Sequence, residues 1–208
     1  MKKKNLAMLF IGALVALVSF TSCTDDDDVK GMVLSGEWRG KFGMYYEYEY
    51  SRDYYETFDA DETYLSFVPD NYSYNRGYGY QVDFYYDRRS PYEEVYHSFT
   101  WEVRYGTIYL DYRGEPELDT YLRDYRMTND RLSGYFGNTN STFLLYKLTD
   151  YYDWTPYINA YGDYRNGASY GYGRPGYYAP TRSGVEAPEG RVIHYGNRAI
   201  DGKVKVTK

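Results

Sequence analysis

The sequence has 208 residues, and its 30 Asp and Glu outnumber its 24 Lys and Arg, which gives a net charge of −6. An acidic chain argues against nucleic acid as a partner, because binding phosphates requires a basic surface. Tyrosine is the unusual component, with 32 residues, and the single cysteine excludes an intrachain disulfide. Tyrosine suits half-buried strand faces, so the composition favours an all-β protein.

Residues 1–22 have the three parts of a secretory signal peptide. Three lysines provide the positively charged start, residues 6–20 form an apolar run, and the small residues Thr21 and Ser22 precede the expected cut. The apolar run is too short to span a bilayer comfortably, since a helix needs about 20 residues to do so. The sequence therefore predicts export of the chain and removal of residues 1–22.

Cys23 is expected to carry a membrane anchor. The stretch FTSC resembles the lipobox of bacterial lipoproteins, with Phe20 where that family usually has leucine. The resemblance implies that the Cys23 thiol receives a diacylglycerol, that the signal peptide is cut before it, and that the new amine is acylated. The alternative is an ordinary signal peptide that leaves a free thiol, in a compartment where cysteines are usually paired. Three acyl chains would make the anchor permanent, whereas a single myristoyl chain binds only reversibly.

Residues 23–31 are expected to form an acidic tether between this anchor and the folded domain. Their four consecutive aspartates repel one another and predict a solvated, disordered spacer: Asp25, Asp26, Asp27 and Asp28. The run also resembles the acidic segment that directs lipoproteins of certain Gram-negative anaerobes to the cell surface, which implies display on the outer membrane. A calcium site is not expected, because consecutive aspartates lack the alternating spacing and the glycine of a Ca²⁺ loop.

Stretches of alternating apolar and polar residues predict eight β-strands. The first, residues 36–50, is expected to be one long strand that bends at Gly40 and Gly43. Turn signals separate it from seven more strands, at residues 64–68, 78–86, 94–104, 107–112, 121–127, 131–136 and 142–148. Short turns between successive strands favour up-and-down antiparallel pairing in a barrel or a sandwich.

Four stretches resemble the pattern of lipocalin-like domains: LSGEW at 34–38, FTWEVRYGTIYLDY at 99–112, MTNDRLSGYF at 127–136 and FLLYKL at 143–148. They are similar to small lipocalin-like lipoproteins, most of uncharacterised function. The resemblance covers residues 32–155 and implies an eight-stranded antiparallel barrel. Lipocalins usually place an arginine of the last strand over the tryptophan of G-x-W, and Lys147 is the nearest candidate here for packing over Trp38.

Residues 156–208 are rich in glycine, proline and tyrosine and lack apolar periodicity. Such a segment buries too little apolar surface to offset the loss of conformational entropy, about 1–2 kcal/mol per residue. The sequence therefore predicts a disordered C-terminal tail, with a weak hairpin near its end as the alternative.

Five aromatic residues on apolar strand faces are expected either to form the core or to line a ligand: Trp38, Phe42, Tyr46, Phe99 and Trp101. Eight strands leave little room beyond side chains, so we expect a filled interior that also holds Met44, Phe84, Leu110 and Phe143. His97 shares a face with Phe99 and Trp101 and is expected to be buried and hydrogen-bonded rather than to act as a ligand or a base.

The sequence contains none of the common motifs for catalysis, nucleotide binding or metal binding. His194 is the only other histidine, so neither a histidine-based metal cluster nor a cofactor is expected. Acidic pairs are too common in this chain to indicate a glycoside hydrolase, which needs two carboxylates facing one cleft. We therefore expect a non-enzymatic structural or interaction protein at the cell surface, with an envelope protein or a glycan as its partner. The alternative is a binding protein for a small apolar or carbohydrate ligand, in the barrel or at its rim.

Overall fold

The computed structural model describes residues 26–149, 152–155, 158 and 190–201. The predicted signal peptide, the lipidation candidate Cys23, the first aspartate of the acidic run and most of the predicted tail lie outside these residues. Within the described part of the chain, no helix is both long enough and apolar enough to cross a membrane.

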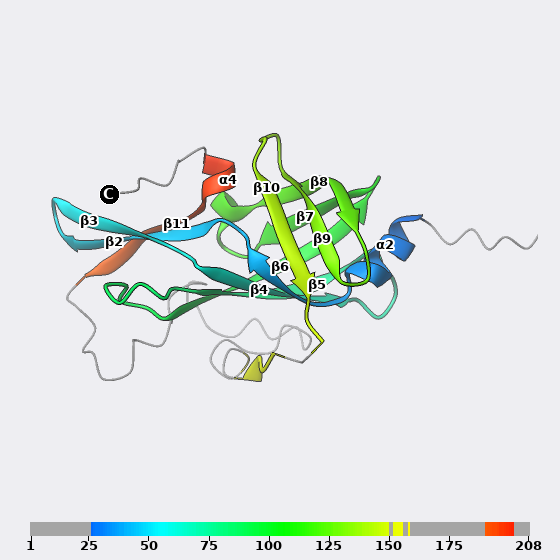
Figure 1. Cartoon of the computed structure of the whole chain (residues 1–208), viewed down its shortest axis with the longest axis horizontal. Helices are drawn as coiled ribbons and strands as arrows, with labels where there is room; N and C mark the ends of the chain where they lie inside the picture. Colours follow the sequence, from blue (N-terminus) through cyan, green and yellow to red (C-terminus); the bar gives the residue numbers. More distant parts are fainter. Residues whose placement is uncertain (1–25, 150–151, 156–157, 159–189, 202–208) are drawn as a thin grey trace, which may run out of the picture.

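Eight antiparallel strands close into a barrel, which confirms the predicted fold class (Figure 1). The strands are β1 (Gly36–Lys41), β4 (Glu62–Pro69), β5 (Arg76–Phe84), β6 (Glu94–Arg104), β7 (Thr107–Tyr112), β8 (Thr120–Met127), β9 (Arg131–Phe136) and β10 (Thr142–Lys147). From β4 to β10 each strand pairs with the next, and β1 closes the ring by pairing with both β4 and β10. This is the up-and-down order that short turns favour.

The predicted long first strand is wrong, because two strands occupy residues 36–50. Gly43 has a φ of +78°, a left-handed conformation that glycine adopts without strain, and the strand breaks there. Strand β2 (Met44–Ser51) leaves the barrel and pairs with β3 (Tyr54–Asp59), which the sequence reading did not predict. These two strands form a hairpin that extends beyond the barrel at the end opposite helix α2, which spans Asp26–Leu34 (Figure 1).

The C-terminal segment is not wholly without structure, which corrects the predicted disordered tail for its described residues. Strand β11 (Arg191–Asn197) pairs with β2 and completes a three-stranded sheet in the order β11-β2-β3, and α4 (Arg198–Asp201) follows. The side chain of Asn197 donates a 2.7 Å hydrogen bond to the Phe42 carbonyl, and Tyr195 is buried. The strand forms here because β2 offers it an unpaired edge, which composition alone does not reveal.

Part of the acidic run is helical rather than a disordered spacer. Helix α2 (Asp26–Leu34) starts with three aspartates, which suits the positive end of a helix dipole. Asp27 accepts backbone hydrogen bonds from Tyr105 and Gly106 in the β6–β7 turn, at 2.7 and 2.9 Å. Asp28 accepts one from Asn75 in the β4–β5 loop at 3.1 Å. These contacts fix α2 against one end of the barrel, opposite the β11-β2-β3 sheet (Figure 1).

Strand β5 turns its apolar face outward, which overturns the prediction that Phe84 fills the interior. Tyr80 and Val82 are buried in a second cluster outside the barrel, where Trp154 covers them and Phe84 packs alongside. The Trp154 indole donates a 2.9 Å hydrogen bond to Glu37. Because side chains alternate along a strand, the polar residues of β5 point into the barrel instead.

Candidate functional site

The five predicted aromatic residues are all buried, so the structure places them in the core: Trp38, Phe42, Tyr46, Phe99 and Trp101. Four of them lie in or beside the barrel strands β1 and β6, and Tyr46 lies on β2, outside the barrel wall. Tyr46 packs edge-on against Tyr85, with ring centroids 4.8 Å apart. The other expected interior residues Met44, Leu110 and Phe143 are buried as well.

The two ends of the barrel are covered by the chain itself. At the α2 end, the Trp38 indole donates a 2.7 Å hydrogen bond to the Leu34 carbonyl, and Leu34 is buried. At the other end, Tyr195 of β11 packs edge-on against His97, with ring centroids 5.4 Å apart. The barrel interior is therefore closed by protein at both ends, and its side chains belong to one continuous core.

A buried ionic triad lies inside the barrel, and the sequence reading did not assemble it. His97 on β6 contacts Glu115 through Nδ1 at 2.9 Å and Asp83 of β5 through Nε2 at 3.4 Å. Asp83 also accepts hydrogen bonds from Thr63 at 2.5 Å and from Gln81 at 2.8 Å. The predicted burial and hydrogen bonding of His97 are thus confirmed.

The electrostatics of this triad favour a charged histidine. Burial by itself lowers the pKa of His97, but the charges and hydrogen bonds of Glu115 and Asp83 outweigh it and raise the pKa to about 10. His97 is then an imidazolium that compensates two buried carboxylates. Since Asp83, His97 and Glu115 are all buried, the triad holds β5, β6 and the segment before η1 (Pro116–Leu118) together rather than facing a substrate.

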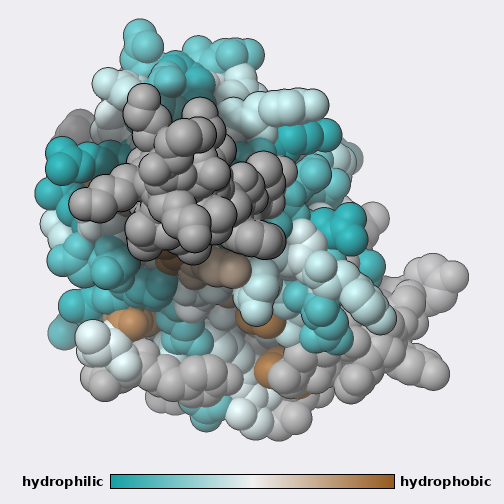
Figure 2. Space-filling model, turned by 90° about the vertical axis from the view of Figure 1, so that its right-hand side faces the viewer, coloured by the Kyte–Doolittle hydropathy of each residue, from teal (hydrophilic) through white to brown (hydrophobic). Residues whose placement is uncertain are grey.

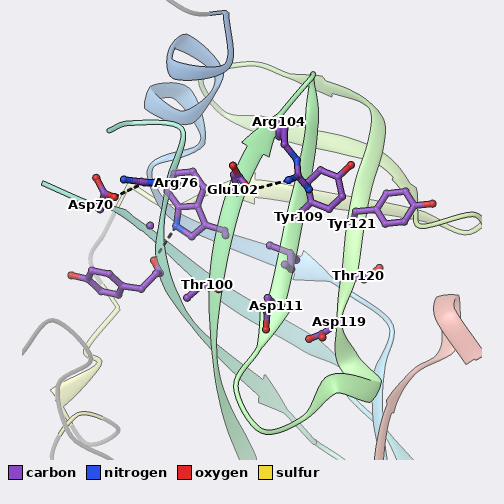
Figure 3. Close-up of a pocket in the computed structure, with 14 residues that line it drawn as sticks. Asp70, Arg76, Thr100, Glu102, Arg104, Tyr109, Asp111, Asp119, Thr120 and Tyr121 are labelled. Atoms are coloured by element: carbon purple, nitrogen blue, oxygen red, sulfur yellow. Dashed lines mark hydrogen bonds and ion pairs between the residues drawn. The ribbon is translucent and has the colours of Figure 1, made fainter. Parts of the chain in front are cut away.

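A groove of about 750 Å³ lies on the outer surface of the barrel, across β5 to β8 (Figure 3). Thr100, Glu102 and Arg104 alternate along β6 with buried residues, so they point outward into it. The groove extends from Asp70 in the β4–β5 loop and Arg104 at the end of β6 to the start of β8. Its lining includes three tyrosines and four carboxylates: Tyr78, Tyr109 and Tyr121, and Asp70, Glu102, Asp111 and Asp119.

Aromatic rings and carboxylates share this groove. The rings of Tyr109 and Tyr121 lie 5.8 Å apart, and the Arg104 guanidinium sits 4.6 Å from the Tyr109 ring centroid. Among the described residues of the lining, Arg104 and Arg76 are the two cations against four carboxylates, so this part of the groove has an excess of negative charge. Burial raises the pKa of Asp119, with the neighbouring acids Asp111 and Glu117 acting in the same direction, although a backbone hydrogen bond from Tyr112 opposes them.

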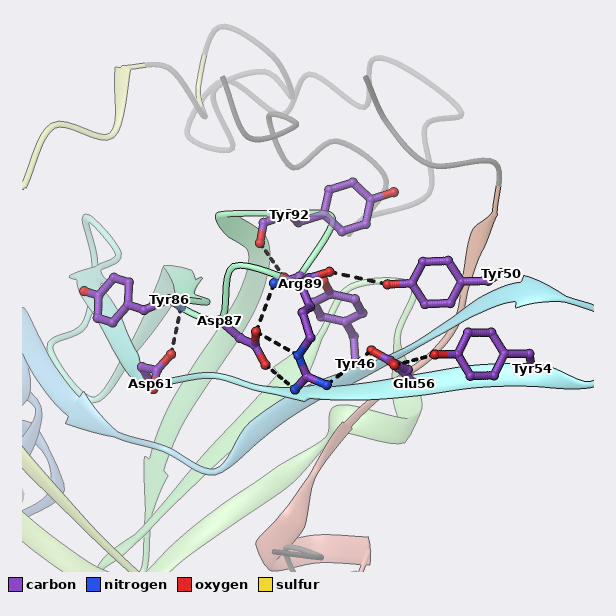
Figure 4. Close-up of polar contacts among 10 residues, drawn as sticks. Tyr46, Tyr50, Tyr54, Glu56, Asp61, Tyr86, Asp87, Arg89 and Tyr92 are labelled. Carbon is purple, nitrogen blue, oxygen red and sulfur yellow. Dashed lines mark hydrogen bonds and ion pairs between the residues drawn. The ribbon is translucent and has the colours of Figure 1, made fainter. Parts of the chain in front are cut away.

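Polar contacts lock the base of the β2–β3 hairpin to the β5–β6 loop (Figure 4). Arg89 of that loop pairs with Asp87 at 2.7 Å and lies 3.9 Å from Glu56 on β3. The hydroxyl groups of Tyr46 and Ser90 are 2.5 Å apart. The contacts of Glu56 with Arg89 and of Tyr46 with Ser90 therefore attach the hairpin to this loop.

Within the described residues, no three His, Cys, Asp or Glu side chains are arranged to hold a metal ion. No protein-family model, no curated protein and no solved structure matches this chain. Functional conclusions consequently depend on the sequence patterns and on the geometry described above.

Proposed function

We propose that this chain is a non-enzymatic interaction protein, anchored to the outer membrane through lipid on Cys23 and displayed at the cell surface. Support for the anchor comes from the signal-peptide pattern and the FTSC stretch. Support for an interaction role comes from the barrel, whose interior is filled by buried side chains while a groove is open on its outer surface. The partner class that we favour is a neutral glycan of the cell envelope.

This proposal rests on one observation: side chains fill the interior of the barrel, whereas its outer surface carries an open groove. The ligand cups of hollow barrels need an open mouth and a cavity of about 300–1,000 Å³. Here Trp38, Phe99 and Trp101 occupy the centre, while the groove of about 750 Å³ lies outside the wall. Binding is therefore expected at the surface of β5 to β8.

The chemistry of the groove suits a neutral polyhydroxylated ligand. The carboxyl oxygens of Asp111 and Asp119 would accept hydrogen bonds from hydroxyl groups of a ligand. The flat rings of Tyr109 and Tyr121 offer apolar faces against which a sugar ring could pack. The excess of acids over cations disfavours anionic ligands such as uronic acid polymers.

Calorimetric titration of residues 24–208 with neutral and with uronic acid oligosaccharides tests the proposed ligand class. We expect saturable binding of a neutral oligosaccharide, weakened roughly two- to tenfold in Tyr109→Ala and in Tyr121→Ala, as for the loss of one aromatic contact. Tyr146→Ala is the matched control, because Tyr146 is an exposed tyrosine on β10 outside the groove. Saturable binding of a fatty acid or haem, lost in Trp101→Phe, would instead show that the interior is a ligand cup.

The anchor requires its own test. Mass spectrometry of the mature N-terminus should find acyl chains on Cys23, and Cys23→Ala should leave a soluble or uncleaved precursor. Cleavage at another position without acyl chains would contradict the proposal. For surface display, Asp25 and Asp26 should be replaced before the other two aspartates, because Asp27 and Asp28 also hold the barrel loops.

A further inference from the structure

The short distance between the anchor and the barrel limits how the molecule can stand on a membrane. Cys23 and Asp26 are separated by two residues, and successive Cα atoms are about 3.8 Å apart, so their Cα atoms lie within about 11 Å of each other. Helix α2 begins at Asp26. A lipid on Cys23 would therefore hold the first turn of α2 close to the lipid headgroups.

Helix α2 is fixed to the barrel, so this restraint extends to the whole domain. Asp27 binds the β6–β7 turn, and Asp28 binds the β4–β5 loop. At the other end of the helix, Lys147 of β10 donates a 2.8 Å hydrogen bond to the Val33 carbonyl. A helix held by three separate parts of the barrel cannot act as a loose hinge.

The loops around α2 expose aromatic and apolar side chains. Tyr72 in the β4–β5 loop and Tyr105 in the β6–β7 turn are each 92% exposed, more than any other large hydrophobic residue of the described chain. Val29 and Met32, three residues apart on α2, are 44% and 45% exposed. Figure 2 views this end and shows separate apolar patches on a largely hydrophilic surface.

We propose that the α2 end of the barrel rests on the lipid surface and that the β11-β2-β3 sheet points away from it. Tyrosine suits this position, because its ring enters the apolar boundary while its hydroxyl stays in water. Figure 1 shows α2 and the hairpin at opposite ends of the long axis of the molecule, so the hairpin would project outward. This inference rests on the lipid attachment proposed above.

Coupling the single cysteine chemically makes the orientation testable without relying on acylation by cells. Residues 23–208 are coupled at Cys23 to a maleimide that carries one acyl chain, and partitioning onto phosphatidylcholine vesicles is measured by sedimentation. One chain gives only reversible binding, so the partition coefficient reports any additional contact between protein and lipid. Tyr72→Asn with Tyr105→Asn should lower the partition coefficient several-fold. Asparagine suits residue 105, which has a φ of 51°.

The matched control is Tyr54→Asn with Tyr55→Asn, which removes two exposed tyrosines at the opposite end. This pair should leave partitioning unchanged. As a second readout, nitration by tetranitromethane should be slowed by vesicles at Tyr72 and Tyr105 but not at Tyr54 and Tyr55.

The inference would be overturned if the two double substitutions changed the partition coefficient equally. It would also be overturned if vesicles slowed nitration equally at both ends of the molecule. Such a result would leave the proposed anchor intact. Absence of acyl chains on Cys23 in cells would instead contradict the proposed function. The proposed orientation on the membrane would then be contradicted as well. The two failures are thus distinguishable.

Discussion

Lys147 on β10 holds its ammonium nitrogen 5.0 Å from the ring centroid of Trp38 on β1. The same nitrogen donates a hydrogen bond to the Val33 carbonyl at 2.8 Å. One side chain therefore connects the last barrel strand, the first barrel strand and the end of α2. Lys147, which the sequence offered only as the nearest candidate for this position, thus packs over Trp38. Burial lowers the pKa of Lys147.

Replacing Lys147 with methionine should destabilise the fold by about 1–2 kcal/mol. The variant keeps most of the aliphatic packing but loses the cation–π contact and the hydrogen bond to Val33. Urea unfolding followed by tryptophan fluorescence measures the change. Lys41→Met on β1 is the control, since Lys41 is exposed and should shift the free energy of unfolding by less than about 0.5 kcal/mol. Equal effects of the two substitutions would contradict a specific role for Lys147.

The buried triad should make stability depend on pH. The pKa of His97 is about 10 in the folded protein against an ordinary value of 6.5, so the protonated form stabilises the fold. This contribution is fully present below pH 6.5 and is lost as the pH rises towards 10. The difference in unfolding free energy between the wild type and His97→Gln should therefore shrink between pH 6 and pH 10.5. Burial holds the pKa of Tyr85 and of Tyr112 well above its usual range, so these tyrosines stay neutral in that window.

At neutral pH, His97→Gln should cost about 3–5 kcal/mol, because it leaves two buried carboxylates without their cation. A difference between the two proteins that stays constant from pH 6 to pH 10.5 would show that His97 is not charged in the fold.

Two neighbouring aspartates should differ in their effect on stability. Asp27→Ala leaves the backbone N–H groups of Tyr105 and Gly106 without their acceptor and should cost about 1–3 kcal/mol. Asp26→Ala removes a side chain that is 79% exposed and should change little. Thermal unfolding of both variants compares them directly. Similar melting temperatures would mean that the acidic run is only a solvated spacer.

Weakening the contacts of strand β11 should destabilise the β2–β3 hairpin. Asn197→Ala leaves the buried Phe42 carbonyl without its 2.7 Å hydrogen bond and should cost about 1–3 kcal/mol. Ile193→Ala, on the same strand but 44% exposed, is the control. Limited proteolysis should cut the β2–β3 hairpin faster in Asn197→Ala than in the control. Equal protection would imply that residues 32–155 hold the hairpin in place without β11.

The alternating pattern predicted all eight barrel strands but not which face each strand turns inward. Strand β5 has an apolar face, Tyr80 and Val82, that looks like core, yet Trp154 covers it from outside. Its inner face instead carries Gln81 and Asp83. A covering segment that lies far along the chain can invert the usual assignment, and periodicity within one strand does not contain that information.

The candidate sites were harder to predict for the same reason. Burial of His97 followed from its position on an apolar face, but its partners Asp83 and Glu115 come from another strand and from a loop. The outer groove is assembled from side chains of β5 to β8 that lie far apart in the sequence, among them Arg76, Tyr109 and Tyr121. The strand β11 forms because β2 has an open edge, and the composition of the C-terminal segment gives no sign of that edge.

The ion pair between Arg191 and Glu49 joins β11 to β2 across 142 residues of chain. Because a ribosome releases the N-terminal part first, β2 has β3 but not β11 as a pairing partner until residue 191 has been made. A two-stranded hairpin is marginally stable by itself. At a translation rate of about 5–20 residues per second, synthesis of the 142 residues from Glu49 to Arg191 takes roughly 7–30 s. During that time the free edge of β2 is open to a chaperone or to a strand of another chain. The translation rate thus helps to decide whether the edge of β2 pairs first with β11 or with another chain.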